Sequence, residues 1–260
     1  MPFLKKSDTR IHYQLNGNPT KPALLFSNSL GTDLSMWDAQ VNALSDDFYI
    51  IRYDTRGHGH SSRDGNPFGL AALGIDVLEL MDHLSLPQVH FCGISMGGLI
   101  GQWLAIHASD RLSKLIIANT AAKIGTEEGW ISRANTILES GIDPIADSAA
   151  SRWFTPDFVA SHAVDVARLV SVLRQTNPRL YAYCCSAIGG SDLRETVRNI
   201  MAPTLVIAGE FDPVTTVNDA DYLCEEIAGA QMATLPASHL SNIEAQNEFN
   251  SAIKDFLGAD

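Results

Sequence analysis

The chain has 260 residues, of which 45% are hydrophobic and 18% charged, a balance typical of a globular protein rather than a disordered one. Its 30 acidic and 18 basic residues give a formal net charge of −12. Polyanions and anionic membrane surfaces are bound by clustered Lys and Arg, whereas the longest basic run here is Lys5-Lys6. The composition therefore argues against a nucleic-acid-binding protein and against a protein of the membrane surface.

The four cysteines, Cys92, Cys184, Cys185 and Cys224, do not have the spacing of a zinc site. We expect no secretory signal, because the first ten residues contain no apolar run, and no membrane span, because no apolar stretch approaches about 18 residues. These features predict a protein of the reducing cytoplasm.

Buried strands and amphipathic helices alternate along most of the chain. Strand patterns occupy residues 3–6, 10–15, 23–27, 49–53, 89–92, 114–119, 204–208 and 232–235. Helical patterns follow residue 36, span residues 70–86 and 96–107, and close the chain at 243–257. This order predicts an α/β fold with a mostly parallel, eight-stranded sheet and helices on both faces.

The alternation stops after residue 120. Residues 121–193 contain no convincing buried strand, and their amphipathic helical segments are separated by Gly and Pro. We therefore predict a core of residues 1–120 and 194–260, interrupted by a helical cap of residues 121–193.

The strongest chemical signal is the sequence GISMG around Ser95, placed between a predicted strand and a predicted helix. This is the context of a G-x-S-x-G nucleophile elbow, in which a strained turn raises the serine above the sheet edge. Gly93 and Gly97 provide the small neighbours that such a turn needs. The N–H of Met96 would lie at the start of the helix, where it can stabilise an oxyanion.

A nucleophilic serine needs a base and an acid that orients the base. His239 follows the last predicted strand, and Asp212 follows the strand before it. Because the carboxyl ends of parallel strands gather at one sheet edge, we expect these two side chains to meet there. Glu210 remains an alternative acid. The other position for the acid in this architecture, after the strand at 114–119, has no carboxylate.

Two further loops are candidates for supporting roles. The loop after the strand at 23–27 would supply the second oxyanion donor through the backbone N–H of Leu30, although it is also readable as a simple connection. In the segment DTRGHGHS, His58 and His60 resemble a metal pair without a further ligand. We favour a structural role for that segment, with Arg56 tying it to its neighbours.

These residues together resemble the α/β-hydrolase fold along nearly the whole chain. The runs SNSLGTDLSMWDAQ, RYDTRGHGHS and ASHLSNIE resemble, more narrowly, the 3-oxoadipate enol-lactonases of the β-ketoadipate pathway of aromatic catabolism. One departure is that Ala245-Gln246 follows Glu244, where related enzymes often have a proline. This departure changes no predicted catalytic residue, and it leaves open a divergent paralogue with another ester substrate.

The resemblance implies hydrolysis of a five-membered enol lactone through an acyl-enzyme on Ser95, without a metal or organic cofactor. The substrate is a small anion, and its buried carboxylate needs a cation. Trp130 and Arg133 are three residues apart and share a face if their segment is helical. We predict that they bind the ring and the carboxylate, whereas the structural alternative makes Trp130 part of the cap core. Arg152 and Trp153 form a rival pair.

Other functions remain open from the sequence. They are a broader carboxylesterase, a hydrolase that cleaves carbon–carbon bonds of ring-fission products, and a non-catalytic receptor that keeps the pocket. An epoxide or haloalkane hydrolase is disfavoured, because those enzymes have a carboxylate at the position of Ser95.

Overall fold

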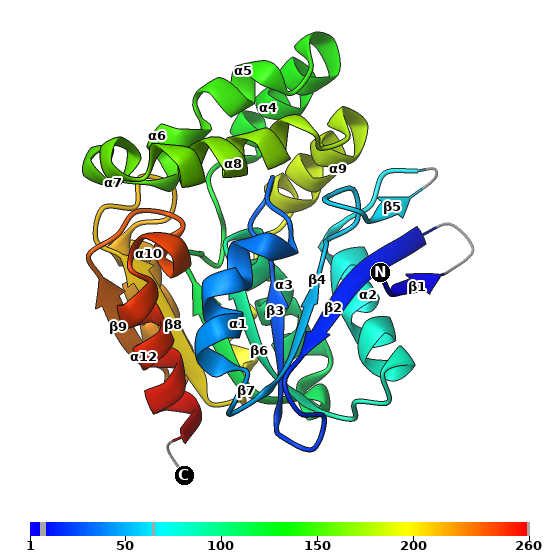
Figure 1. Cartoon of the computed structure of the whole chain (residues 1–260), viewed down its shortest axis with the longest axis vertical. Coiled ribbons are helices and arrows are strands. Elements are labelled where there is room, and N and C mark those ends of the chain that lie inside the picture. The colour runs from blue at the N-terminus through cyan, green and yellow to red at the C-terminus, as the bar shows by residue number, and fades with distance from the viewer. Residues whose placement is uncertain (6–8, 64–65, 259–260) are drawn as a thin grey trace.

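The computed structural model describes residues 1–5, 9–63 and 66–258 (Figure 1). Its sheet has the strand order β1-β2-β4-β3-β6-β7-β8-β9, and the short β5 pairs with β2 beside this path. The strands are β1 Phe3–Lys5, β2 Thr9–Asn16, β3 Ala23–Ser27, β4 Tyr49–Tyr53, β5 Ser62–Arg63, β6 Val89–Ile94, β7 Leu112–Ala118, β8 Thr204–Gly209 and β9 Gln231–Leu235. Only the pairs made by β2 are antiparallel, so the predicted, mostly parallel sheet is confirmed.

The central strands are buried on both faces, which explains their continuous apolar sequences. Leu24, Leu25 and Phe26 of β3 have no exposed surface, and all of β8 is buried. Burial of this kind requires helices on both sides. In Figure 1, α1 (Asp38–Leu44) and α12 (Gln246–Gly258) lie in front of the sheet, and α2 (Leu70–His83) and α3 (Met96–His107) lie behind it.

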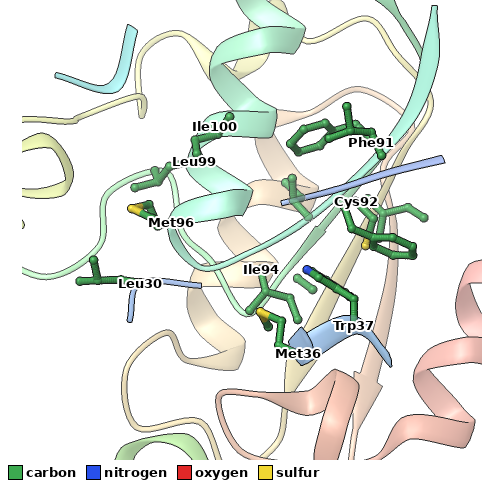
Figure 2. Close-up of a cluster of buried hydrophobic side chains, with 14 of the residues drawn as sticks. Leu30, Met36, Trp37, Phe91, Cys92, Ile94, Met96, Leu99 and Ile100 are labelled. Carbon is green, nitrogen blue, oxygen red and sulfur yellow. The ribbon is translucent and has the colours of Figure 1, made fainter. Parts of the chain in front are cut away.

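One core cluster fills the space between these layers, and Figure 2 shows part of it. Trp37 stacks on Phe26 with ring centroids 4.5 Å apart, and its indole N–H donates to Asn28 over 2.9 Å. Leu30 and Met96, the two predicted oxyanion donors, have side chains that belong to the same cluster. Their backbone positions are therefore fixed by packing.

The structure differs from the sequence prediction at several element ends. The helix predicted for 70–86 ends at His83, because Ser85 adopts a left-handed φ of 54°. The last predicted helix is divided at Ala245 into α11 (Ser241–Glu244) and α12. The two-residue β5 and α10 (Val217–Glu226) were not predicted. Residue 6, the end of the first predicted strand, lies outside the described residues.

Six helices between β7 and β8 lie together above the carboxyl end of the sheet (Figure 1). We call them the cap helices: α4 Glu127–Ser140, α5 Asp143–Asp147, α6 Ala149–Trp153, α7 Pro156–Ser161, α8 Ala163–Arg174 and α9 Pro178–Gly189. Side chains of Thr126, Thr155 and Asn177 cap the starts of α4, α7 and α9. No helix in the described part of the chain is long and apolar enough to cross a membrane.

Candidate active site

Ser95 occupies a strained turn between β6 and α3. Its φ of 57° and ψ of −114° lie in a region that side-chain-bearing residues rarely adopt. A Cβ on Gly97 would lie 2.2 Å from the carbonyl oxygen of Ser27, and one on Gly93 would lie 2.2 Å from that of Gly97. Glycine is therefore required on both sides. The Ser95 N–H donates to the Ala118 carbonyl over 3.0 Å, which holds the turn against β7.

The structure brings His239 and Asp212 together at the same sheet edge. Asp212 follows β8, His239 follows β9, and His239 Nδ1 lies 2.7 Å from Asp212 Oδ2. Both side chains are buried, and His239 lines the same cavity as Ser95. Glu210, the alternative acid, is exposed. This arrangement leaves His239 Nε2 as the ring nitrogen that is free to serve a nucleophile.

The carboxylate of Asp212 accepts an unusually complete set of hydrogen bonds. Oδ1 accepts the N–H groups of Val214 and Thr215 over 2.8 and 3.1 Å, and Oδ2 accepts the Thr215 hydroxyl over 2.8 Å. Burial alone would raise the pKa of Asp212. The charge interaction with His239 and the hydrogen bonds to the carboxylate outweigh burial, and they hold the pKa of Asp212 below its ordinary value. Asp212 therefore stays ionised beside the histidine.

Asn119 is a site residue that the sequence reasoning missed. Its Nδ2 donates to Asp212 Oδ2 and to the carbonyl of Ser238, each over 3.1 Å. Ser241 donates its hydroxyl to Asn119 Oδ1 over 2.5 Å, which fixes the orientation of the amide. Asn119 follows β7, where the sequence analysis noted the lack of an acid. A polar residue directly after β7 lies at the sheet edge where Asp212 and His239 meet, and this position could have identified Asn119 from the sequence.

The segment between β4 and β5 has a structural role, as predicted. Arg56 forms two 2.5 Å contacts with the carboxylate of Asp76. His58 Nε2 accepts the backbone N–H of Gly31 over 2.9 Å, so this histidine holds the loop of Leu30. Burial lowers the pKa of His58 to about 4, which keeps its imidazole neutral and able to accept. No group of His, Cys, Asp and Glu that could bind a metal is found among the described residues.

Core and cap helices together line a small cavity of about 30 Å³ around Ser95. Its lining residues are Ser29, Leu30, Ser95, Trp130, Arg133, Arg152, Trp153, Val214 and His239. The predicted Leu30 thus lies in the cavity wall, and Met96 is the first residue of α3, where backbone N–H groups have no intrahelical acceptor. Both predicted aromatic–arginine pairs reach the cavity, so they are neighbours and not spatial alternatives.

Two arginines share this cavity without a carboxylate partner in the described part of the chain. Arg133 donates to the hydroxyl of Tyr181, and its guanidinium carbon lies 5.4 Å from the Trp130 ring centroid. Arg133 Nε is buried and has no hydrogen-bond partner among the described residues. Arg152 donates to Ser148 and to the Ile145 carbonyl.

The charges of the two guanidinium groups interact. Burial lowers the pKa of Arg152, and the nearby charge of Arg133 lowers it further. Burial also raises the pKa of Tyr181 to about 12, so its phenol is neutral and does not neutralise Arg133. The cavity is therefore locally positive in a protein whose net charge is −12. Such a site suits a small anion.

Comparison with known proteins agrees with this geometry. The family model described as alpha/beta hydrolase fold matches residues 22–141. The chain is 49% identical to 3-oxoadipate enol-lactonase 2 of Acinetobacter baylyi, over 96% of this chain and 94% of that protein. It is 42% identical to 3-oxoadipate enol-lactonase 1 of the same organism, over 95% of this chain and 92% of that protein.

A solved structure gives the same result. The enol-lactonase from Burkholderia xenovorans LB400 superimposes with a TM-score of 0.97 and 42% identity, and the match covers 99% of this chain and 100% of that one. The resemblance stated from sequence motifs is thereby confirmed, and so is the predicted class of enzyme, an ester hydrolase. The chain belongs to the 3-oxoadipate enol-lactonase family of the α/β hydrolases.

Proposed function

We propose that this protein opens the lactone ring of 3-oxoadipate enol-lactone to give 3-oxoadipate, in the β-ketoadipate pathway. The observation that carries the proposal is one cavity lined by Ser95, by His239 and by two arginines that have no carboxylate partner among the described residues. The names of the relatives supply the substrate. A neutral-ester hydrolase would have no need for two cations at this place.

In the first step His239, oriented by Asp212, takes the proton of Ser95 as Oγ attacks the lactone carbonyl. The backbone N–H groups of Leu30 and Met96 stabilise the oxyanion, and each such donor contributes about 10²–10³-fold to kcat. The ring C–O bond then breaks. The leaving oxygen receives the proton from His239 and departs as an enol, which tautomerises to a ketone.

In the second step water completes the reaction. His239 removes a proton from the water, the hydroxide oxygen attacks the acyl carbon, and the bond to Ser95 Oγ breaks as Oγ regains a proton from His239. Ketonisation of the first leaving group discourages ring closure. Each cycle adds one water to the lactone, and the side chains return to their starting protonation states.

The substrate carboxylate is bound in this proposal by Arg133, with the Trp130 ring against the lactone. This assignment is supported by Arg133 Nε, which is buried and has no hydrogen-bond partner in the part of the chain that the structure describes. Arg152 adds a second cation to the lining of the same cavity. Residues 121–193 act as the cap of a core formed by residues 1–120 and 194–260. The four free thiols support the proposed cytoplasmic location.

The test compares two substrates and identifies the product. The purified protein is given the enol lactone or p-nitrophenyl acetate, and the lactone product is analysed by mass spectrometry. We expect a product heavier than the lactone by one water, and a higher kcat/KM for the lactone. A neutral ester that is hydrolysed equally well would instead favour a broader carboxylesterase.

A further inference from the structure

The carboxylate of Glu244 joins the loop of His239 to the cap helices. Glu244 ends α11, and its Oε2 accepts the backbone N–H of Ser238 over 2.7 Å. Its Oε1 accepts the backbone N–H of Thr155 over 3.1 Å and also the Thr155 hydroxyl. Ser238 immediately precedes His239, and Thr155 is the N-cap of α7. One side chain thus bonds the residue that precedes His239 and also the N-cap residue of a cap helix.

A second contact reaches the other side of the histidine. The backbone N–H of Leu240 donates to the carbonyl of Trp153 over 3.0 Å. The cap segment that contains Trp153 and Thr155 is therefore linked to both residues that flank His239, directly to Leu240 and through Glu244 to Ser238. That segment also carries Arg152, and Arg152 and Trp153 line the cavity.

The imidazole ring of His239 and its backbone are held by different groups. Asp212 contacts the ring at Nδ1, which sets its tautomer but does not hold the backbone of the loop. Glu244 contacts the backbone next to His239. Hydrogen bonds to a carboxylate are stronger than those between neutral groups, so Glu244 is suited to fix this loop.

We propose that Glu244 is a positioning residue that keeps His239 in register with the substrate-binding wall of the cap. This proposal rests on the proposed function for the identity of the substrate, but the positioning of His239 applies to any ester. Displacement of a reacting group by about 1 Å costs about 10²-fold in rate. The bond from Oε2 to the loop of His239 should affect kcat. The bonds from Oε1 to Thr155 should affect KM for the acidic substrate.

The experiment measures kcat and KM for the enol lactone and for p-nitrophenyl acetate in four variants. Glu244→Ala removes both contacts. Glu244→Gln keeps one accepting oxygen and guards against a failure of Glu244→Ala to fold. Thr155→Val removes the hydroxyl on the cap side, which bonds Glu244 and also caps α7, and it keeps the backbone N–H of Thr155. Arg168→Ala is the matched control, because Arg168 joins the cap to Ser35 of the core and neither residue lines the cavity around Ser95.

We expect Glu244→Ala to lower kcat for both substrates by about 10²-fold, with KM for p-nitrophenyl acetate within about twofold of wild type. Glu244→Gln should recover part of kcat. Thr155→Val should mainly raise KM for the lactone, and Arg168→Ala should match wild type. Wild-type kcat in both Glu244 variants, or an equal loss in Arg168→Ala, would overturn the proposal.

A spectroscopic readout separates this proposal from the proposed function. The proton shared by His239 Nδ1 and Asp212 gives a far-downfield proton NMR signal that needs no substrate. We expect it in wild type and Arg168→Ala, and we expect it broadened or lost in folded Glu244 variants. An unchanged signal in folded Glu244 variants contradicts the positioning role, even if wild type does not open the lactone.

Discussion

The side-chain amide of Asn119 lies 3.1 Å from the carboxylate of Asp212 and donates a hydrogen bond to it. The same Nδ2 donates to the carbonyl of Ser238, beside His239. Asn119 thus connects the acid with the backbone of the predicted base. Its φ of 44° is left-handed, a conformation that Asn and Asp tolerate better than most residues.

Replacement of Asn119 by Asp should lower kcat/KM by about 10-fold to 100-fold, equivalent to about 1.4–2.8 kcal/mol. The change preserves shape and backbone preference, but it places an acceptor opposite the acceptors of Asp212 and Ser238. The defect should shrink as pH falls, because the introduced carboxyl becomes a donor when protonated. The measurement is kcat/KM of wild type and variant across pH.

Thr215→Val is the matched control for this substitution. It removes another side-chain donor to Asp212 Oδ2, but it leaves Ser238 untouched. We expect a smaller loss of kcat/KM than for Asn119→Asp. A variant Asn119→Asp with wild-type kcat/KM at neutral pH would show that the amide is dispensable.

His58 should make the stability of the protein depend on pH. Its pKa is about 4 in the folded state, because burial outweighs the favourable effects of the Arg56 carbonyl and of the carboxylates of Asp54 and Asp33. In the unfolded chain it is about 6.5. Above the unfolded value both states are neutral. As pH falls from about 6.5 to 4, only the unfolded state gains the proton, so stability is lost.

At 1.36 kcal/mol per unit of pKa shift, this loss amounts to about 3 kcal/mol. Urea unfolding of wild type and His58→Gln at pH 7.5 and pH 4 measures it. The difference in unfolding free energy between wild type and His58→Gln at pH 7.5 is the internal control. At that pH it reports only the lost packing and the lost hydrogen bond to Gly31. The free energy of unfolding should fall by about 3 kcal/mol more in wild type than in the variant. Equal falls would contradict the assignment.

The two cavity arginines should distinguish an acidic substrate from a neutral one. Loss of a charge-assisted hydrogen bond costs about 1.5–3 kcal/mol, so Arg133→Ala should lower kcat/KM for the enol lactone by about 10-fold to 100-fold. Arg152→Ala should have a smaller effect, because the Arg152 guanidinium already donates to Ser148 and to the Ile145 carbonyl of the cap. Neither change should reduce kcat/KM for p-nitrophenyl acetate by more than about threefold. Steady-state kinetics with both substrates measure this.

Arg168 lies in α8 and outside the cavity. Arg168→Ala therefore removes one positive charge from the cap without changing the cavity, and it is the control for the loss of charge. The carboxylate assignment is wrong if Arg133→Ala impairs the neutral ester and the acidic lactone equally. It is also wrong if Arg168→Ala reproduces the effect of Arg133→Ala.

The sequence predicts those elements whose conformation depends on residues close together in the chain. The apolar runs of the central strands and the glycines around Ser95 follow from burial and from one tight turn, and both are readable along the chain. The helix that follows Ser95 was predicted with its observed ends. The order of strands and loops also predicts that Asp212 and His239 lie at one edge of the sheet.

Other features depend on contacts between distant segments. Glu244 meets Thr155 across 89 residues, and Asn119 meets Asp212 across 93, so no periodicity indicates either contact. The break at Ala245 and the left-handed Ser85 are single-residue conformations that the helical patterns do not reveal. From the sequence, Arg133 and Arg152 are alternative candidates for the carboxylate-binding residue. The sequence does not show that both line one cavity.

The central claim is that Ser95 opens the enol lactone. The direct measurement is the loss of ultraviolet absorbance of the enol lactone with wild type and with Ser95→Ala, with Ser132→Ala on the exposed face of α4 as the control. We predict rapid loss with wild type and Ser132→Ala, and a kcat at least about 10⁴-fold lower for Ser95→Ala. A folded Ser95→Ala variant that retains activity within tenfold of wild type, or a wild type that leaves the lactone unopened, would contradict this account.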